Sequence, residues 1–125
     1  MARILVVDDE DTIRTVFKEF LEAKGHEVST ANCAEEAFKK IREGQDIILL
    51  DIVMPGMNGL DVLNSIKEIA PSAEVIMITA LAQDSIGLES FKRGAFDFLA
   101  KPIDLNHLEN LIDYKLVQMS LESES

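Results

Sequence analysis

The sequence predicts an α/β protein in which helices cover both faces of a parallel sheet. Five short runs rich in Val, Ile and Leu alternate with longer segments whose apolar residues recur at helical spacing. Runs such as "ILVV" (4–7) and "IILL" (47–50) are continuously apolar, which is typical of strands buried on both faces. Right-handed crossovers make such alternating strands parallel, so their carboxyl ends share one edge of the sheet.

Each predicted strand is a short β-branched run bounded by polar or turn-forming residues. The five strands are Arg3–Asp8, Glu27–Ala31, Asp46–Asp51, Glu74–Ala80 and Phe96–Lys101. The second is shorter and more polar than the first and third, which favours a place at the edge of the sheet. After the third strand, Pro55 and Gly56 predict a turn.

The predicted helices have recognisable ends. The first two are expected to stop at Gly25 and Gly44, and the third before Pro71. Asn32 and Glu35 have the spacing of a capping pair for the second helix. The fourth helix is marked by Ile86, Leu88 and Phe91 and closed by Gly94. Asp104 is expected to cap the fifth, whose apolar stripe is Leu108, Leu111, Ile112, Leu116 and Met119.

Length and composition indicate one acidic globular domain. The 125 residues are 47% hydrophobic and 28% charged, and 23 Asp and Glu against 12 Lys and Arg give a net charge of −11. This balance argues against direct binding of nucleic acid or an anionic membrane and suits cations or basic partners. Acidity that only keeps the protein soluble is an equally good interpretation.

The same composition gives little reason to expect a secreted or zinc-binding protein. Cys33 is the sole cysteine, and His26 and His107 are expected to be surface residues. The early apolar run Ile4–Val7 is too short for a signal peptide or a membrane span, so we expect a cytoplasmic protein.

Polar side chains end four of the five predicted strands. They are Asp8 and Asp9, Asp51, Thr79 and Lys101. In a parallel sheet all of them reach the crevice at the carboxyl edge. Taken singly, each has a structural explanation: the acidic pair could cap the next helix, and Asp51 could begin the turn. Thr79 could be an ordinary strand residue and Lys101 a solvated one. Their convergence on one edge favours a functional site.

The chemistry that uses this set is phosphoryl transfer to a carboxylate. Asp8, Asp9 and Asp51 would repel one another unless a hard divalent cation joined them, and Mg²⁺ fits best, with Mn²⁺ as a substitute. Asp51 would attack phosphorus and form an acyl phosphate. Lys101 and the metal would neutralise the phosphoryl oxygens, and Thr79 would donate a hydrogen bond to one of them.

Four segments resemble the receiver domain of two-component response regulators. They are "VVDDE", "LLDIVMPGMNG", "MITA" and "GAFDFLAKP", in this order and spacing, and the likeness covers essentially the whole chain. The resemblance implies a single flavodoxin-like (βα)5 domain, doubly wound, with strand order 2-1-3-4-5. We expect the receiver domain to occupy residues 1–119, and residues 120–125 to be a frayed polar tail or the start of a linker.

The resemblance also implies roles for individual residues. Asp51 corresponds to the phosphoacceptor, Asp9 to a direct Mg²⁺ ligand, Asp8 to a ligand acting through water, and Val53 to a backbone carbonyl ligand. Thr79 corresponds to the switch hydroxyl.

Three further positions near the fifth strand match the family. Lys101 corresponds to the phosphate-binding lysine, and the Lys101–Pro102 bond is expected to be cis. Phe98 corresponds to the aromatic switch residue, although a core aromatic that never moves is the alternative. Switching would change the surface made by the fourth helix, fifth strand and fifth helix.

The implied partners are a sensor histidine kinase or a phosphotransfer protein as donor, and an output partner or fused effector domain. A homodimer through the fourth-helix to fifth-helix face is a further expectation. The domain would be a signalling phosphoacceptor rather than an enzyme. Val53 and Leu81 are apolar where polar residues are commoner, and we expect them to hinder the water that hydrolyses the phospho-aspartate.

Two rival functions remain from the residues alone. A metal-dependent phosphatase or phosphotransferase with an aspartyl nucleophile usually has a second acid, but Val53 stands two residues after Asp51. Such enzymes also carry a cap for which these 125 residues have no insertion. The second rival is a flavodoxin-like interaction module whose acidic cluster binds no metal.

Overall fold

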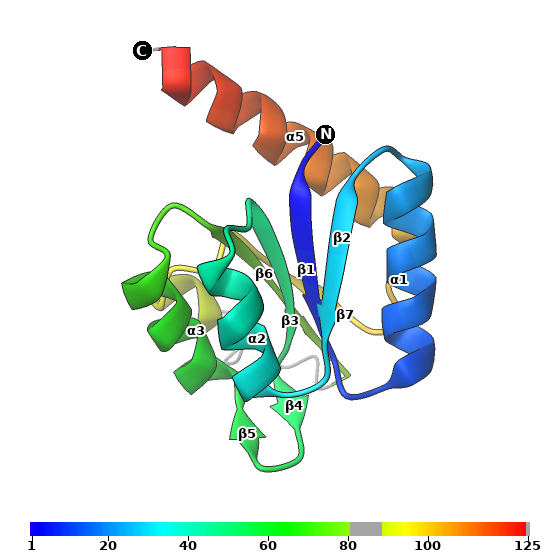
Figure 1. Ribbon diagram of the computed structural model, residues 1–125, viewed down its shortest axis with the longest axis vertical. Coiled ribbons are helices and arrows are strands. Elements are labelled where there is room, and N and C mark those ends of the chain that lie inside the picture. Colours follow the sequence, from blue (N-terminus) through cyan, green and yellow to red (C-terminus); the bar gives the residue numbers. More distant parts are fainter. Residues whose placement is uncertain (81–88, 125) are drawn as a thin grey trace.

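A five-stranded parallel sheet forms the centre of the molecule in a computed structural model, which describes residues 1–80 and 89–124 (Figure 1). Its strands are β1 (Arg3–Val7), β2 (Glu27–Ala31), β3 (Ile47–Asp51), β6 (Glu74–Thr79) and β7 (Asp97–Ala100). The spatial order is β2-β1-β3-β6-β7, and every neighbouring pair is parallel. Counted along the chain, this is the predicted order 2-1-3-4-5, with the polar β2 at one edge.

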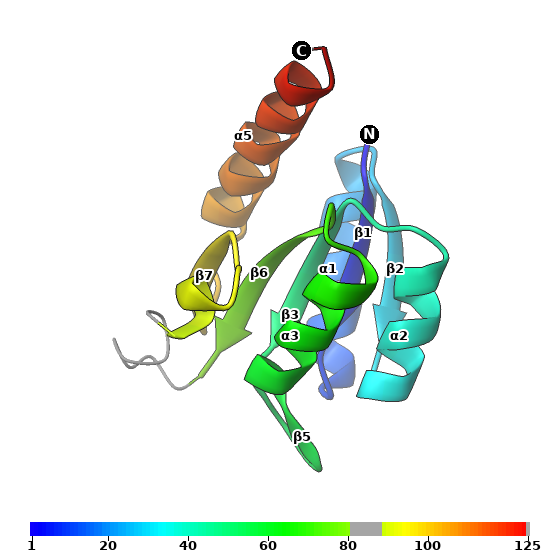
Figure 2. The ribbon, with the colours of Figure 1, turned by 90° about the vertical axis from the view of Figure 1, so that its left-hand side faces the viewer.

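Two apolar cores lie on opposite faces of the sheet because successive strand residues point to opposite sides. Helices α1 (Asp11–Ala23) and α5 (Leu105–Glu124) cover one face, and α2 (Ala34–Arg42) and α3 (Gly59–Ile69) cover the other (Figures 1 and 2). Residues 89–92 are also helical. Ile86 and Leu88, which we expected in the fourth helix, lie outside the described residues.

A small antiparallel hairpin follows β3 and was not predicted. It consists of β4 (Val53–Met54) and β5 (Met57–Asn58), joined by the predicted turn at Pro55 and Gly56. The hairpin lies at the carboxyl end of the sheet, between Asp51 and the start of α3 (Figure 1).

The predicted helix ends are partly correct. α1 and α2 end just before Gly25 and Gly44, as expected. Asp104 caps α5, because its Oδ1 accepts hydrogen bonds from the N–H groups of Asn106 (2.9 Å) and His107 (3.3 Å).

The predicted capping pair of Asn32 and Glu35 is wrong. The N-cap of α2 is Cys33, which places Glu36 rather than Glu35 at the third helical position. From there the Glu36 carboxylate reaches back and accepts a hydrogen bond from the Asn32 N–H (3.0 Å).

Helix α5 is longer than the apolar stripe suggested. It continues through Glu124, whereas the frayed tail or start of a linker expected for residues 120–125 stays a prediction. Leu121 and the glutamates that follow are good helix formers, which favours the extension. Its last turns project past the amino end of the sheet (Figure 2). The domain boundary at residue 119 stays a prediction.

None of the helices in the described part of the chain is both long enough and apolar enough to cross a membrane. His107 is exposed, as predicted for a surface residue. His26 is half-buried instead, and its Nδ1 accepts a hydrogen bond from the Ala2 N–H (3.1 Å).

Candidate functional site

The strand ends bring the predicted polar residues to one edge of the sheet. Asp8 follows β1, Asp51 ends β3, Thr79 ends β6 and Lys101 follows β7. Asp8 is 2% exposed, Asp51 is 3% exposed and Thr79 is completely buried. Burial of two carboxylates is costly without a compensating cation, so the position of Lys101 decides what the site can do.

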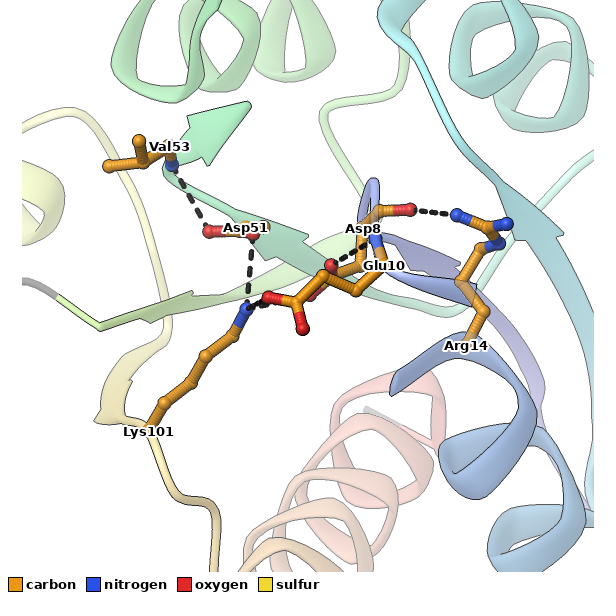
Figure 3. Close-up of polar contacts among 6 residues, drawn as sticks. All are labelled: Asp8, Glu10, Arg14, Asp51, Val53 and Lys101. Atoms are coloured by element: carbon orange, nitrogen blue, oxygen red, sulfur yellow. Dashed lines mark hydrogen bonds and ion pairs between the residues drawn. The ribbon is translucent and has the colours of Figure 1, made fainter. Parts of the chain in front are cut away.

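The ammonium of Lys101 joins the two buried carboxylates. Its Nζ lies 3.0 Å from Asp8 Oδ2 and 3.2 Å from Asp51 Oδ2, and the Lys101 side chain is only 14% exposed (Figure 3). A third carboxylate, that of Glu10, lies 3.5 Å from the same ammonium. Lys101 therefore partly neutralises the acidic groups at the edge of the sheet.

The pKa values reflect this balance. Burial raises the pKa of Asp51, and the nearby charge of Asp8 adds to the rise; the hydrogen bond from the Val53 N–H and the charge of Lys101 oppose it without cancelling it. Burial disfavours the charged form of Lys101, but its hydrogen bond to Asp8 and the charges of Asp51 and Asp8 outweigh burial and raise its pKa. The charge of an ionised Asp51 is therefore not fully balanced by its neighbours, and a further cation would stabilise it.

Carboxylate oxygens of Asp8, Asp9 and Glu10 form the group that could hold a metal ion. One oxygen from each lies within 4.8 Å of the others, with Asp8 buried and the other two exposed. This all-oxygen donor set fits a hard cation such as Mg²⁺ or Mn²⁺. Asp51, which we grouped with Asp8 and Asp9, belongs to no such group among the described residues. It faces the Lys101 ammonium instead.

Sequence reasoning did not assign Glu10 to the site. Its contact with Lys101 joins residues 91 positions apart, which periodicity does not reveal. The acidic run "DDED" at 8–11, which continues past the predicted pair, was the available signal.

The backbone after Asp51 is held by close main-chain contacts. The Val53 N–H donates to Asp51 Oδ1 (3.1 Å), and the Ile52 N–H donates to the Ile78 carbonyl on β6 (2.9 Å). Gly59, at the start of α3, donates its N–H to the Ile52 carbonyl (3.0 Å). A Cβ on Gly59 would lie 2.5 Å from Ile52 Cα, so this position accepts only glycine without a shift. Sequence reasoning missed Gly59.

The other predicted residues lie around the ends of β6 and β7. The Lys101 N–H donates to the Thr79 carbonyl (2.8 Å), and the Lys101–Pro102 bond is cis, the isomer that the resemblance implies. Phe98 is half-buried against the core under α2 and α3 and pairs in register with Met77. Val53 has an exposed side chain. Leu81 lies outside the described residues.

Fold and site together define a doubly wound α/β domain whose carboxyl edge carries a buried acidic centre bridged by one lysine. A family model described as "Response regulator receiver domain" matches residues 4–113. The chain therefore belongs to the receiver domain family of two-component response regulators, which are signalling domains.

Individual relatives agree with this assignment. The chain is 40% identical to the DNA-binding transcriptional regulator NtrC of Azospirillum brasilense, over 92% of this chain and 24% of NtrC. It is 39% identical to the chemotaxis protein CheY of Thermotoga maritima, over 80% of this chain and 85% of CheY. The crystal structure of a CheY-like receiver domain from Methanospirillum hungatei superposes with a TM-score of 0.92 at 32% identity, covering 98% of both chains. The chain thus spans about a quarter of NtrC but most of CheY.

Proposed function

We propose that this domain accepts a phosphoryl group on Asp51 from a phosphohistidine of a sensor histidine kinase or phosphotransfer protein. The observation that carries the proposal is the Lys101 ammonium held 3.0 Å from Asp8 and 3.2 Å from Asp51 at the buried edge of the sheet. Membership of the receiver family supports it.

Each residue of the site would take a separate part in phosphoryl transfer. An Asp51 carboxylate oxygen attacks phosphorus, a P–O bond forms as the P–N bond of the donor breaks, and the leaving imidazole takes up a proton. The Lys101 ammonium, which pairs with the Asp51 carboxylate before transfer, would then pair in part with a phosphoryl oxygen. Mg²⁺ held by Asp8, Asp9, Asp51 and the Val53 carbonyl would supply further neutralisation of the phosphoryl oxygens. Later attack by water returns the Asp51 carboxylate and releases phosphate.

The signal would leave the site through Thr79 and Phe98. Thr79 lies buried at the end of β6, next to the strand that carries Phe98. A hydrogen bond from the Thr79 hydroxyl to the phosphoryl group would move β6 locally and change the space available to the Phe98 ring. That change would reach the surface formed by residues 89–92, β7 and α5.

The partner that reads this surface would be an output protein or a fused effector domain. NtrC, of which the chain matches about a quarter, is named a DNA-binding transcriptional regulator, which makes a fused effector a concrete form of this proposal. Exposed apolar side chains on α5 support the homodimer proposed for this face. They are Tyr114, Val117 and Leu121.

Phosphoryl uptake from acetyl phosphate tests the proposal. With Mg²⁺ present, intact-protein mass spectrometry should find one phosphoryl group on wild type and none on Asp51→Asn. Uptake should cease when EDTA removes the metal. Repeated hydrolysis of a small phosphate ester would favour a phosphatase instead, and no adduct with any donor would favour the interaction module.

A further inference from the structure

Arg14 connects the first turn of α1 to the segment that carries the acidic residues. Its Nη1 donates a hydrogen bond to the backbone carbonyl of Asp8 (2.6 Å), and its Nη2 pairs with the carboxylate of Asp11. Figure 3 shows the guanidinium on the side of Asp8 opposite Lys101. The Arg14 side chain is only 15% exposed, which is unusual for an arginine on a helix surface.

Every polar atom of Asp8 has a partner in this arrangement. The Asp8 N–H donates to the Ala31 carbonyl (3.1 Å), and Oδ1 accepts from the Glu10 N–H (2.9 Å). Oδ2 faces Lys101, and Arg14 binds the backbone carbonyl. The contact from Arg14 orients the Asp8 peptide without competing for either carboxylate oxygen.

Arg14 also binds the far end of the same segment. Its backbone N–H donates to the Glu10 carbonyl (3.1 Å). Asp9 and Glu10, whose exposed carboxylates belong to the group that could hold a metal ion, therefore lie between the Asp8 carbonyl, bound by the Arg14 side chain, and the Glu10 carbonyl, bound by the first backbone hydrogen bond of the helix. A hydrogen bond from a charged donor is stronger than a neutral one, and a guanidinium can bind two acceptors at once.

We propose that Arg14 is a positioning residue that holds residues 8–11 so that Asp8 and Asp9 can bind a divalent cation. This inference rests on the proposed function of the site. The positioning role of Arg14 and its positive charge predict opposite effects on cation binding. As a positive charge beside the site, Arg14 should weaken cation binding, whereas as a clamp it should strengthen it. The sign of the change on removing Arg14 therefore identifies its role.

Three variants separate these roles. Arg14→Met removes both charge and clamp, and Arg14→Lys keeps the charge but loses the fork that reaches Asp8 and Asp11 together. Lys18→Met is the matched control, because Lys18 is an exposed cation one turn further along α1 that lines the same surface cavity as Arg14. It removes the same charge without touching the Asp8 carbonyl.

Mg²⁺ affinity measured by calorimetry is the first readout, and amide hydrogen exchange of Asp9 and Glu10 in the metal-free proteins is the second. We expect Arg14→Met to bind Mg²⁺ about tenfold more weakly, the scale found for residues that orient metal ligands. Arg14→Lys should lie between it and wild type, and Lys18→Met should match wild type or bind slightly more tightly. Exchange at Asp9 and Glu10 should be faster in both Arg14 variants.

Several results would overturn the inference. They are tighter Mg²⁺ binding by Arg14→Met, equal affinity of Arg14→Lys and wild type, or unchanged exchange at residues 9 and 10. If Arg14→Met does not fold, the comparison of Arg14→Lys with wild type tests the inference. If wild type takes up phosphate but the Arg14 variants match it in Mg²⁺ affinity and amide exchange, the positioning role of Arg14 is wrong and the proposed function stands. If wild type binds Mg²⁺ and the differences appear but no phosphate is taken up, the proposed function fails and the positioning role stands.

Discussion

The two connections that carry the carboxylates follow neighbouring strands but are held in different ways. Between β1 and α1, side chains make the critical contacts: Arg14 binds the Asp8 carbonyl, and the Asp8 carboxylate binds the Glu10 N–H. Between β3 and α3, the Asp51 carboxylate likewise binds the Val53 N–H, but the main chain adds the β4–β5 hairpin and the approach of Gly59 to the Ile52 backbone.

The helix starts differ in the opposite sense, because a side chain caps α3 but none among the described residues caps α1. Asn58 caps α3, since its Oδ1 accepts a hydrogen bond from the Leu60 N–H (2.9 Å). The N-cap of α1 is Glu10, whose side chain makes no capping bond within the described residues and faces Lys101 instead. In the β1–α1 connection, the N-cap side chain points to the site and does not stabilise the helix. In the β3–α3 connection, the N-cap side chain stabilises the helix start that follows the phosphoacceptor candidate.

The largest expected effect comes from Gly59→Ala. Alanine favours a helix over glycine by at most about 1 kcal/mol, but the new Cβ would lie 2.5 Å from Ile52 Cα, and backbone at that point cannot move aside cheaply. Overpacking of this kind costs about 2–3 kcal/mol, so we expect net destabilisation in urea unfolding. Thr12→Ala, an exposed change early in α1, should stay within about 0.5 kcal/mol. Equal stability of both variants would contradict the main-chain account.

Asp51→Asn should stabilise the metal-free protein at pH 7 by about 1 kcal/mol, the scale of single-site effects. Because the folded-state pKa of Asp51 is raised, its ionised form opposes folding above that pKa and this penalty fades as pH falls toward about 4. Urea unfolding in EDTA at pH 7 and pH 4 measures this. The advantage of the variant should shrink at pH 4, and Mg²⁺ should stabilise wild type more than the variant. A less stable variant at pH 7 would show that the pairing with Lys101 outweighs burial.

Asn58→Ala and Glu10→Ala compare the two helix starts directly. Loss of the Asn58 cap should cost about 1 kcal/mol of unfolding free energy. Glu10→Ala should cost less than about 0.5 kcal/mol, since its exposed carboxylate makes no cap and its contact with Lys101 is long. Paired urea titrations in EDTA check both values. A larger cost for Glu10→Ala than for Asn58→Ala would mean that the Glu10 side chain, despite making no cap, stabilises its helix start more than the Asn58 cap does.

The sheet and most of the site could be predicted because two simple regularities govern them. Continuous apolar runs marked the strands, and parallel topology placed Asp8, Asp51, Thr79 and Lys101 at one edge. What the sequence did not reveal depends on contacts between atoms. The hairpin strands have two residues each, too few for a periodic pattern.

Other misses have equally specific physical causes. The carboxylate that reaches Asn32 belongs to Glu36 because α2 begins one residue later than the spacing suggested. The need for glycine at position 59 arises only when α3 meets the Ile52 backbone. Glu10 joins the site through Lys101, far away in the chain, and Arg14 joins it by folding back across a helical turn.

Val53→Asn tests whether a side chain on the rigid connection tunes the lifetime of the phospho-aspartate. Val53 donates its N–H to Asp51, and its side chain is 51% exposed, so it lies at the solvent side of the site. An apolar side chain there should hinder an approaching water, whereas asparagine can hydrogen-bond it. We expect Val53→Asn to lose its phosphoryl group about threefold faster, a change of under 1 kcal/mol in the barrier. Phosphoprotein decay followed by mass spectrometry after removal of the donor measures both rates, with Val53→Thr as a control of similar shape. Faster decay in wild type would mean that the Val53 side chain does not shield Asp51. The β3–α3 connection would then affect the site through its main chain and not through this side chain.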